Sequence, residues 1–170
     1  SSDAASFITA LNKHFRLGLS NEDLSDIALA TGSDCPFFIT GTPAYAEGRG
    51  EILTPADHLK EKLFILVLWP GIHVSTREAY DKCTPKPREE SLTTYFRLPP
   101  EEWKHLITND FEESVFLKHP LLAEIKERLY SSGSLYSAMS GSGSAVYGIY
   151  RDKPVIPAGL EKMVVYSGLL

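Results

Sequence analysis

The hydrophobic residues at the start of the chain follow a helical period. They recur at spacings that place them on one face of a helix over about 2–15, a face predicted to be buried: Phe7, Ile8, Leu11 and Phe15. A serine followed by acidic residues predicts a second helix over about 21–30, with Ser20 as its N-cap. The chain is therefore expected to open with two helices.

Shorter apolar runs bounded by turn residues predict strands farther along the chain. Residues 37–40 and 42–47 are predicted to pair as a hairpin, and a turn at 48–50 leads into 51–53. The continuous apolar run 63–68 predicts a strand buried on both faces. The sequence before this run is thus expected to form a small mixed region, with a junction near its end.

The rest of the chain is predicted to form helices and then further strands. The helical segments are expected at about 75–82, 100–106, 110–117 and 121–129, and the strands at about 136–139, 145–150 and 162–166. The polar, proline-bearing segment 84–90 is expected to be a mobile loop. This order predicts an α+β sandwich, with domains over 1–58 and 59–170.

Composition and charge argue against nucleic-acid binding, membrane spanning and side-chain metal binding as functions. The chain has 170 residues, is 43% hydrophobic and carries a formal charge of −5, which argues against nucleic acid or an anionic membrane as partner. The run 63–68 is too short to span a bilayer. The two cysteines and five histidines lack metal-ligand spacing, so no side-chain metal site is predicted. The two cysteines do not suggest a disulfide scaffold, so a reducing, cytoplasmic location is expected.

The segment Ser140-Gly-Ser-Gly-Ser144 carries the clearest chemical signal, because it lies between two predicted strands. Glycine lets the backbone approach a ligand closely, and exposed amide N–H groups with alternating hydroxyls suit a phosphate. An ordinary Gly/Ser hairpin turn has the same composition. From this segment alone, the two interpretations remain open.

Two other places could bind or act on an anion. Ser1 and Ser2 precede the first helix, where free N–H groups attract anions, although two serines also make a simple helix cap. Asp34 lies in the turn Gly32–Pro36, and a carboxylate at a fixed edge can accept a proton from an attacking hydroxyl. Locally, an aspartate that only stabilises the turn is the simpler interpretation.

Taken together, three segments resemble the GHMP kinases, a family of small-molecule kinases. They are Ser1-Ser-Asp-Ala-Ala5, Gly32-Ser-Asp-Cys-Pro-Phe-Phe38 and the Met139–Gly148 stretch. Weaker matches are Gly48-Arg-Gly-Glu51, Asn109-Asp-Phe-Glu112 and His119-Pro120. Ser33 and Cys35 depart from the residues common in the family. The resemblance covers essentially the whole chain.

The resemblance implies a fold class and a place within it. The α+β chain would be the C-terminal part of a two-domain GHMP kinase. Residues 1–58 would be the remainder of the ATP-binding domain, and residues 59–170 a ferredoxin-like α/β sandwich. The glycines of the first phosphate loop and an active-site lysine would precede Ser1, so the chain alone is expected to lack kinase activity.

The resemblance also implies roles for individual residues. Asp34 would be the catalytic base, and Ser1 and Ser2 would bind the phosphates of ATP with Mg²⁺ as counter-ion. The substrate would be a cytidine-diphosphate-linked methylerythritol, bound by Thr76, Tyr80, Gly141, Ser142 and Gly143. Another GHMP kinase with a different alcohol substrate, and a non-catalytic phosphate-binding module, are the alternatives. Exposed strand edges suggest a homodimer.

Overall fold

The computed structural model describes residues 1–170 apart from 57–60, 82 and 84–89. The chain forms two compact units, Ser1–His58 and Leu59–Leu170. The loop predicted at 84–90 lies almost wholly outside the described residues. The units are described separately below.

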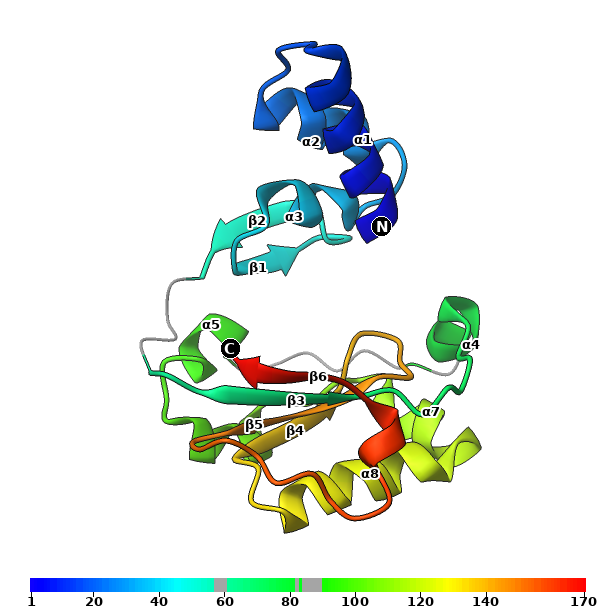
Figure 1. Ribbon diagram of the computed structural model, residues 1–170, viewed down its shortest axis with the longest axis vertical. Coiled ribbons are helices and arrows are strands. Elements are labelled where there is room, and N and C mark those ends of the chain that lie inside the picture. The colour runs from blue at the N-terminus through cyan, green and yellow to red at the C-terminus, as the bar shows by residue number, and fades with distance from the viewer. Residues whose placement is uncertain (57–60, 82, 84–89) are drawn as a thin grey trace. The chain divides into compact units, whose positions relative to one another are not determined.

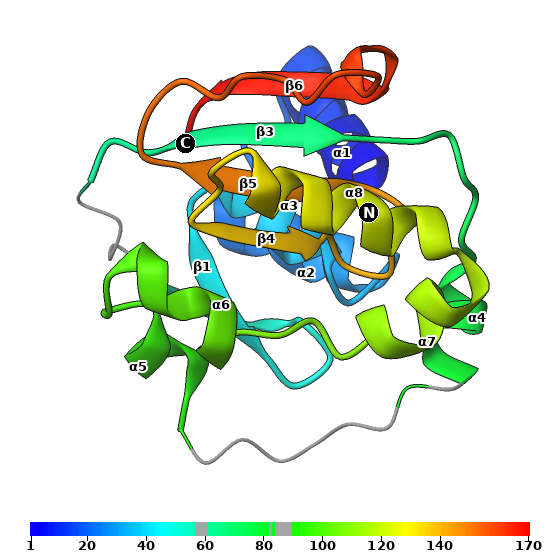
Figure 2. The ribbon, with the colours of Figure 1, turned by 90° about the horizontal axis from the view of Figure 1, so that it is seen from below.

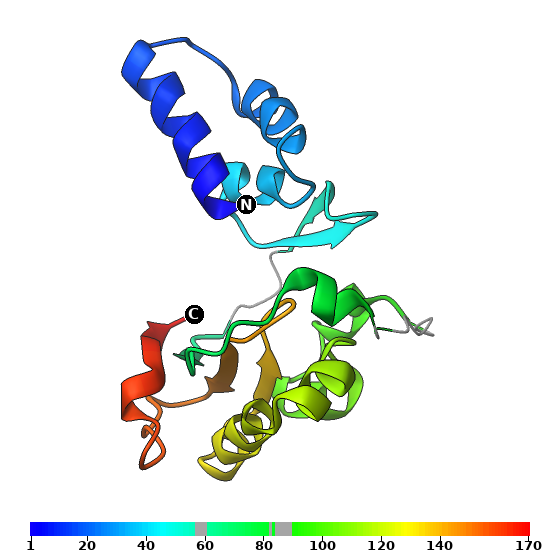
Figure 3. The same ribbon diagram turned by 90° about the vertical axis from the view of Figure 1, so that its right-hand side faces the viewer.

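The N-terminal unit begins with the two predicted helices and ends with a hairpin (Figures 1 and 3). Its elements are α1 (Ser2–Phe15), α2 (Asn21–Leu29), α3 (Cys35–Thr40), β1 (Ala44–Glu47) and β2 (Ile52–Pro55). The predicted cap of α2 is confirmed, because Asp23 N–H donates to Ser20 Oγ at 3.1 Å and Ser20 N–H donates to the Asp23 carboxylate at 2.8 Å.

The buried face predicted for α1 is only partly correct. Ile8 and Leu11 are half-buried, whereas Phe7 and Phe15 are 65% and 63% exposed. The helix instead packs on α2 and α3 through its most buried residue, Ala5. Phe7 and Phe15 therefore lie outside the face of α1 that packs on α2 and α3.

The strand predicted at 37–40 is wrong, because these residues belong to helix α3. Pro36 occupies the first turn of α3, where its fixed φ suits a helix and its missing N–H costs nothing. Gly41 then ends the helix in the left-handed region with φ 62°. The hairpin pairs β1 with β2, from Ala44 opposite Pro55 to Glu47 opposite Ile52.

The C-terminal unit is a four-stranded antiparallel sheet with helices on its faces (Figures 1 and 2). Its elements are β3 (Phe64–Leu68), α4 (Thr76–Asp81), α5 (Leu92–Tyr95), a 3₁₀ turn (Pro100–Glu102), α6 (Trp103–Leu106), α7 (Glu112–Lys118), α8 (Pro120–Ser131), β4 (Tyr136–Met139), β5 (Val146–Tyr150), a second 3₁₀ turn (Glu161–Met163) and β6 (Val164–Leu169). The strand order β4-β5-β3-β6 confirms the α+β sandwich, with the second 3₁₀ turn in place of a second crossover helix.

Alternation along β3 separates two cores on the two faces of the sheet. Leu66 and Leu68 point into the first core, which α7 and α8 complete with Val115, Leu122, Ile125 and Leu129. Ile149 on β5 and Tyr136 on β4 point into the second core, around the buried ring of Trp103. Figure 2 shows α8 lying across the sheet on the side of the first core.

Truncation of Leu122 tests which helix face supports the first core. Leu122→Ala should lower the free energy of unfolding of the C-terminal unit by about 2–5 kcal/mol, because Leu122 is fully buried. Leu117→Ala is the matched control: Leu117 is 80% exposed, and its loss should cost less than about 0.5 kcal/mol. Urea denaturation followed by tryptophan fluorescence measures both, and equal losses would contradict this packing.

Candidate functional site

The Gly/Ser segment forms a tight turn between β4 and β5, as predicted. Ser140 N–H donates to Ala145 O at 2.8 Å, and Gly143 N–H donates to Ser140 O at 3.0 Å. Gly141 and Gly143 have φ of 54° and 94°, values that other residues rarely adopt. A Cβ on Gly143 would also lie 2.7 Å from Met139 Sδ. Glycine is therefore required at Gly143 by conformation and by space.

The turn is connected to the segment that leads into α4. Ser144 is buried, and its hydroxyl donates to the carbonyl of Ile72. Ser75 then caps α4, because Glu78 N–H donates to Ser75 Oγ at 3.1 Å. The predicted substrate residue Thr76 is the first, exposed residue of this helix. The structure thus joins the Gly/Ser turn and α4 through one buried hydroxyl.

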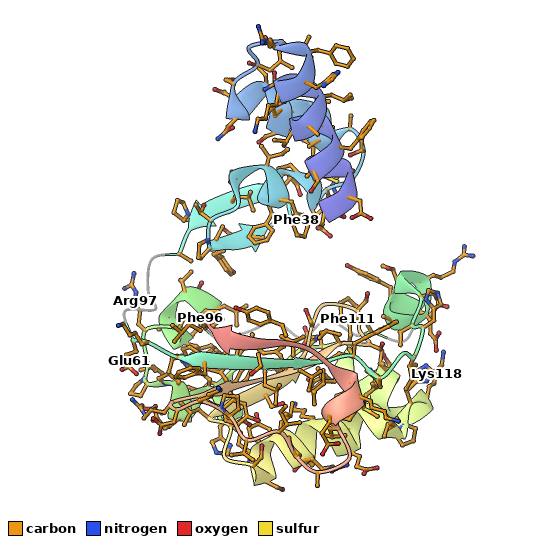
Figure 4. The ribbon with its side chains drawn as sticks, viewed as in Figure 1. Phe38, Glu61, Phe96, Arg97, Phe111 and Lys118 are labelled. Atoms are coloured by element: carbon orange, nitrogen blue, oxygen red, sulfur yellow. The ribbon has the colours of Figure 1, made fainter. Side chains whose placement is uncertain are left out.

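Tyr80 lies on α4 with its ring largely in solvent. Its side chain is 64% exposed, and its ring contacts the edge of Phe111 at a centroid distance of 4.8 Å (Phe111 is labelled in Figure 4). Phe111 itself packs against the first core. One side of the Tyr80 ring is therefore supported, while much of its surface is available to a ligand.

An ion pair connects α4 to α7. Lys118 Nζ lies 3.1 Å from Glu78 Oε1, and His119 Nε2 lies 3.4 Å from the same oxygen. The hydrogen bond from Lys118 holds the pKa of the Glu78 carboxyl below its usual range. The interaction is therefore present at neutral pH and is lost as the pH falls through that lowered pKa.

Sequence reasoning assigned no role to Asn109 and Glu112, which the structure places against the Gly/Ser turn. Asn109 Nδ2 donates to Met139 O and to Gly141 O, both at 2.8 Å. Glu112 Oε1 accepts the Met139 N–H at 2.7 Å, and Glu112 is only 8% exposed. The only signal in the sequence was the Asn109–Glu112 family match, which carries no information on contacts.

Asp34 is exposed at the start of α3 in the N-terminal unit. The backbone of Gly50 lies directly against it, because a Cβ on Gly50 would be 2.4 Å from Asp34 Oδ1. Gly50 also has φ 111°, a conformation suited to glycine alone. The sequence predicted a turn at 48–50 but gave no sign that it lies against the predicted catalytic carboxylate.

Ser1 and Ser2 are exposed at the start of α1, and α1 packs against α3. Ser1 is the N-cap, its carbonyl accepts the Ala5 N–H at 3.0 Å, and its side chain makes no capping hydrogen bond. The serine hydroxyls and the first-turn N–H groups therefore lie at the positive end of the helix dipole. This arrangement is compatible with an anion at the helix start.

An apolar groove of about 420 Å³ lies on the second face of the sheet. Its lining residues are Ile65, Val67, Phe96, Trp103, Ser140, Ala145, Tyr147, Ile149 and Leu170. The groove reaches the base of the Gly/Ser turn but contains none of the predicted substrate residues. Figure 4 shows Phe96 and Phe111 far apart in this unit, so the groove and the Tyr80 ring lie in different places.

Comparison with known proteins shows which protein family part of the chain resembles. Residues 97–164 match the family described as GHMP kinases C terminal. The matched stretch includes Asn109, Phe111, Glu112 and the whole Gly/Ser turn. The matched residues are therefore similar to the C-terminal domain of the GHMP kinases, a family of small-molecule kinases.

The chain is also similar to individual kinases over nearly its whole length. The chain is 44% identical over 157 residues to 4-diphosphocytidyl-2-C-methyl-D-erythritol kinase of Bacteroides thetaiotaomicron, covering 92% of this chain and 57% of the relative. It is also 44% identical over 171 residues to the kinase of that name from Azobacteroides pseudotrichonymphae genomovar. CFP2, covering 98% of this chain and 62% of the relative. The chain thus spans little more than half the length of these relatives.

A solved structure of a kinase of this type is also similar to the chain. The crystal structure of 4-(cytidine 5'-diphospho)-2C-methyl-D-erythritol kinase superposes with a TM-score of 0.69 at 30% identity, covering 86% of this chain and 53% of that one. Within the described part of the chain, no helix is long and apolar enough to cross a membrane.

Replacement of Gly50 tests its contact with Asp34. Gly50→Ala should displace the Asp34 carboxylate, because the added methyl would overlap Oδ1. The amide and carboxyl chemical shifts of Asp34 measure the displacement. Gly18→Ala is the control, since Gly18 also has positive φ, 71°, but nothing lies within 4 Å of its Cβ position. Equal effects of the two changes on Asp34 would contradict a direct contact.

Proposed function

We propose that the protein containing this chain transfers the γ-phosphoryl group of ATP to the 2-hydroxyl of 4-diphosphocytidyl-2-C-methyl-D-erythritol. The observation that supports this most directly is the connection of the Gly/Ser turn to α4. Ser144 bonds Ile72, and Asn109 bonds Gly141 while its neighbour Phe111 contacts Tyr80. A phosphate-binding turn and an exposed aromatic ring beside the same short segment suit an acceptor that carries both phosphates and a base.

In this mechanism Asp34 accepts the proton of the attacking hydroxyl as the new P–O bond forms. Its exposed carboxylate can reach a substrate, and the close backbone of Gly50 limits its movement. A restricted base loses little orientational freedom during the reaction, which lowers the barrier. If Asp34 does not act as the base, it is an aspartate that only stabilises the start of α3.

Ser1 and Ser2 would bind the phosphates of ATP. The N–H groups of the first turn of α1 and the helix dipole favour negative charge there. Since Ser1 makes no side-chain capping bond, its hydroxyl does not have to leave a partner in order to bind a phosphate oxygen. This supports the assignment of α1 as one wall of the nucleotide site.

We infer that Mg²⁺ accompanies the nucleotide. Within the described residues, no group of at least three His, Cys, Asp or Glu side chains could hold a metal ion by itself. This fits Mg²⁺, which usually keeps several waters and binds through substrate phosphates with one or two carboxylates. The Ser1 and Ser2 hydroxyls offer suitable oxygen ligands beside the nucleotide phosphates. Bound Mg²⁺ would neutralise phosphate charge.

The cytosine of the acceptor would stack on Tyr80, with Thr76 at the start of the same helix available for a polar contact. The turn Gly141–Gly143 would receive the diphosphate. The support for Tyr80 is its exposure together with the contact of Phe111 at its edge, which limits the rotation of the ring. A ring that is already restricted loses less entropy on stacking.

We further propose a homodimer formed through β6. This strand lies at one edge of the sheet and exposes Val165, Tyr166 and Leu169. The opposite edge, formed by β4, is less available for pairing, because Asn109 and Glu112 already bond the backbone of Met139 there. A single open edge favours pairing that stops at two copies. Cys35 and Cys83 are both free thiols, which supports a cytoplasmic location.

Asp34→Asn tests the proposed base. In the protein expressed from the whole reading frame that contains this chain, kcat should fall by about 10²–10⁴-fold, because the amide cannot accept the proton. Coupled detection of ADP release, with and without the cytidylyl acceptor, measures the activity. Asp26→Asn changes an exposed aspartate on α2 and should leave kcat unchanged. No acceptor-dependent ADP release from the unmodified protein would exclude the proposed function, and ligand binding without turnover would indicate a binding module.

Tyr80→Ala tests stacking. Loss of the ring should raise the KM for the cytidylyl acceptor by about 5- to 150-fold, from a stacking free energy of about 1–3 kcal/mol. Tyr80→Phe keeps the π-face and should change that KM by less than about twofold. The KM for ATP should stay the same in both variants. A KM for the acceptor that is unaffected by Tyr80→Ala would place the base elsewhere.

A further inference from the structure

The residues that shape the Gly/Ser turn come from a segment about thirty positions away in sequence. Every polar atom of the Asn109 side chain is used: Nδ2 donates to Met139 O and Gly141 O, and Oδ1 accepts the Phe111 N–H at 3.0 Å. Because a single amide nitrogen bonds both carbonyls, it fixes the bend between them. Neither carbonyl can turn toward a bound anion without breaking its hydrogen bond, and a carbonyl oxygen near a phosphate would repel it.

Glu112 restrains Met139 as well, through the backbone N–H of that residue rather than through its carbonyl. Its Oε1 accepts the Met139 N–H, and its Oε2 lies 2.6 Å from Lys126 Nζ on α8. Both carboxylate oxygens are therefore occupied, and the charge of this buried group is compensated. The thioether of Met139 in turn lies against Gly143, where a Cβ would be 2.7 Å from Sδ. Restraint of Met139 thus extends into the turn.

The same segment supports α4. Phe111, between Asn109 and Glu112, makes the edge contact with the Tyr80 ring. At the other end of α7, Lys118 pairs with Glu78 on α4. One short segment, 109–112, therefore contacts both elements to which the proposed function assigns the acceptor.

We propose that Asn109 and Glu112 are positioning residues: they hold the Gly/Ser turn in the shape that receives the acceptor's diphosphate. This inference rests on the proposed function for the identity of the ligand. The restraint on the turn itself stands on the hydrogen bonds alone. Neither residue touches the reacting atoms, so both act through the backbone of Met139 and Gly141.

Asn109→Asp is the test variant. It preserves size and the acceptor for Phe111 N–H, removes both donors and places a carboxylate oxygen beside two carbonyls. In this chain, amide hydrogen exchange at Ser140 and Gly143 should accelerate by at least about tenfold, while exchange in α8 stays unchanged. Asn109→Ala removes the donors without adding charge and gives the same expectation if Asn109→Asp does not fold.

Asn12→Asp is the matched control. Asn12 also bonds the backbone through both ends of its side-chain amide, but in the N-terminal unit: Nδ2 donates to Leu19 O at 3.0 Å and Oδ1 accepts Leu19 N–H at 3.1 Å. The same chemical change there should leave exchange at Ser140 and Gly143 as it was. Acceleration by both variants would mean general destabilisation and would overturn the proposal.

A kinetic readout separates positioning from stability. In the protein from the whole reading frame, Asn109→Asp should raise the KM for the cytidylyl acceptor by about tenfold, with the KM for ATP unchanged. An active protein whose acceptor KM and turn exchange are unaffected by Asn109→Asp would overturn the proposal. Accelerated turn exchange in a protein that never phosphorylates the acceptor would support the restraint on the turn and exclude the proposed function.

Discussion

The C-terminal unit depends on the buried carboxylate of Glu112. One of its oxygens accepts a backbone N–H from the end of β4, and the other pairs with Lys126 on α8. The charge thereby joins α7, α8 and the sheet at the point where the Gly/Ser turn begins. Removal of either partner would leave a polar group or charge buried without compensation, at a cost of several kcal/mol. Glu112 is therefore proposed to help hold the shape of the turn through these two interactions.

A second constraint is the close approach of backbone to functional groups at glycines. A Cβ added to Gly50 would lie 2.4 Å from Asp34 Oδ1, and one added to Gly143 would lie 2.7 Å from Met139 Sδ. Both residues also have positive φ. In each unit, a glycine thus lets the backbone lie close to a side chain at the proposed site, and a larger residue there would force one of the two to shift.

Local sequence patterns predicted most elements because their signals are local. Ser20 with its acidic turn, the apolar run of β3 and the Gly/Ser turn between two strands all follow from nearest neighbours in sequence. Residues 37–40 were mispredicted as a strand because an aromatic run also suits a short helix once Pro36 starts it and Gly41 ends it. The exposure of Phe7 depends on which face of α1 meets α2 and α3, which no local pattern specifies.

The candidate site was predictable only in part, because some of its contacts depend on packing that local sequence patterns do not specify. The Gly/Ser turn and Asp34 were noted from local sequence as possible anion-binding or proton-accepting positions. Tyr80 and the specific catalytic and binding roles came from the family resemblance, and these roles stay predictions. Asn109 and Glu112 contact residues about thirty positions away, and Gly50, in the turn between β1 and β2, lies beside Asp34 at the start of α3. Such contacts follow from the fold rather than from spacing, so they became visible only in the structure.

The most direct test of the central claim, that α4 and the Gly/Ser turn form one ligand site, is a titration of the ¹⁵N-labelled chain with cytidine diphosphate. Amide chemical shifts should move together at Thr76, Tyr80 and Gly141–Gly143, with a single dissociation constant. Shifts confined to the apolar groove around Ile65 and Leu170, or no shifts at millimolar ligand, would contradict it.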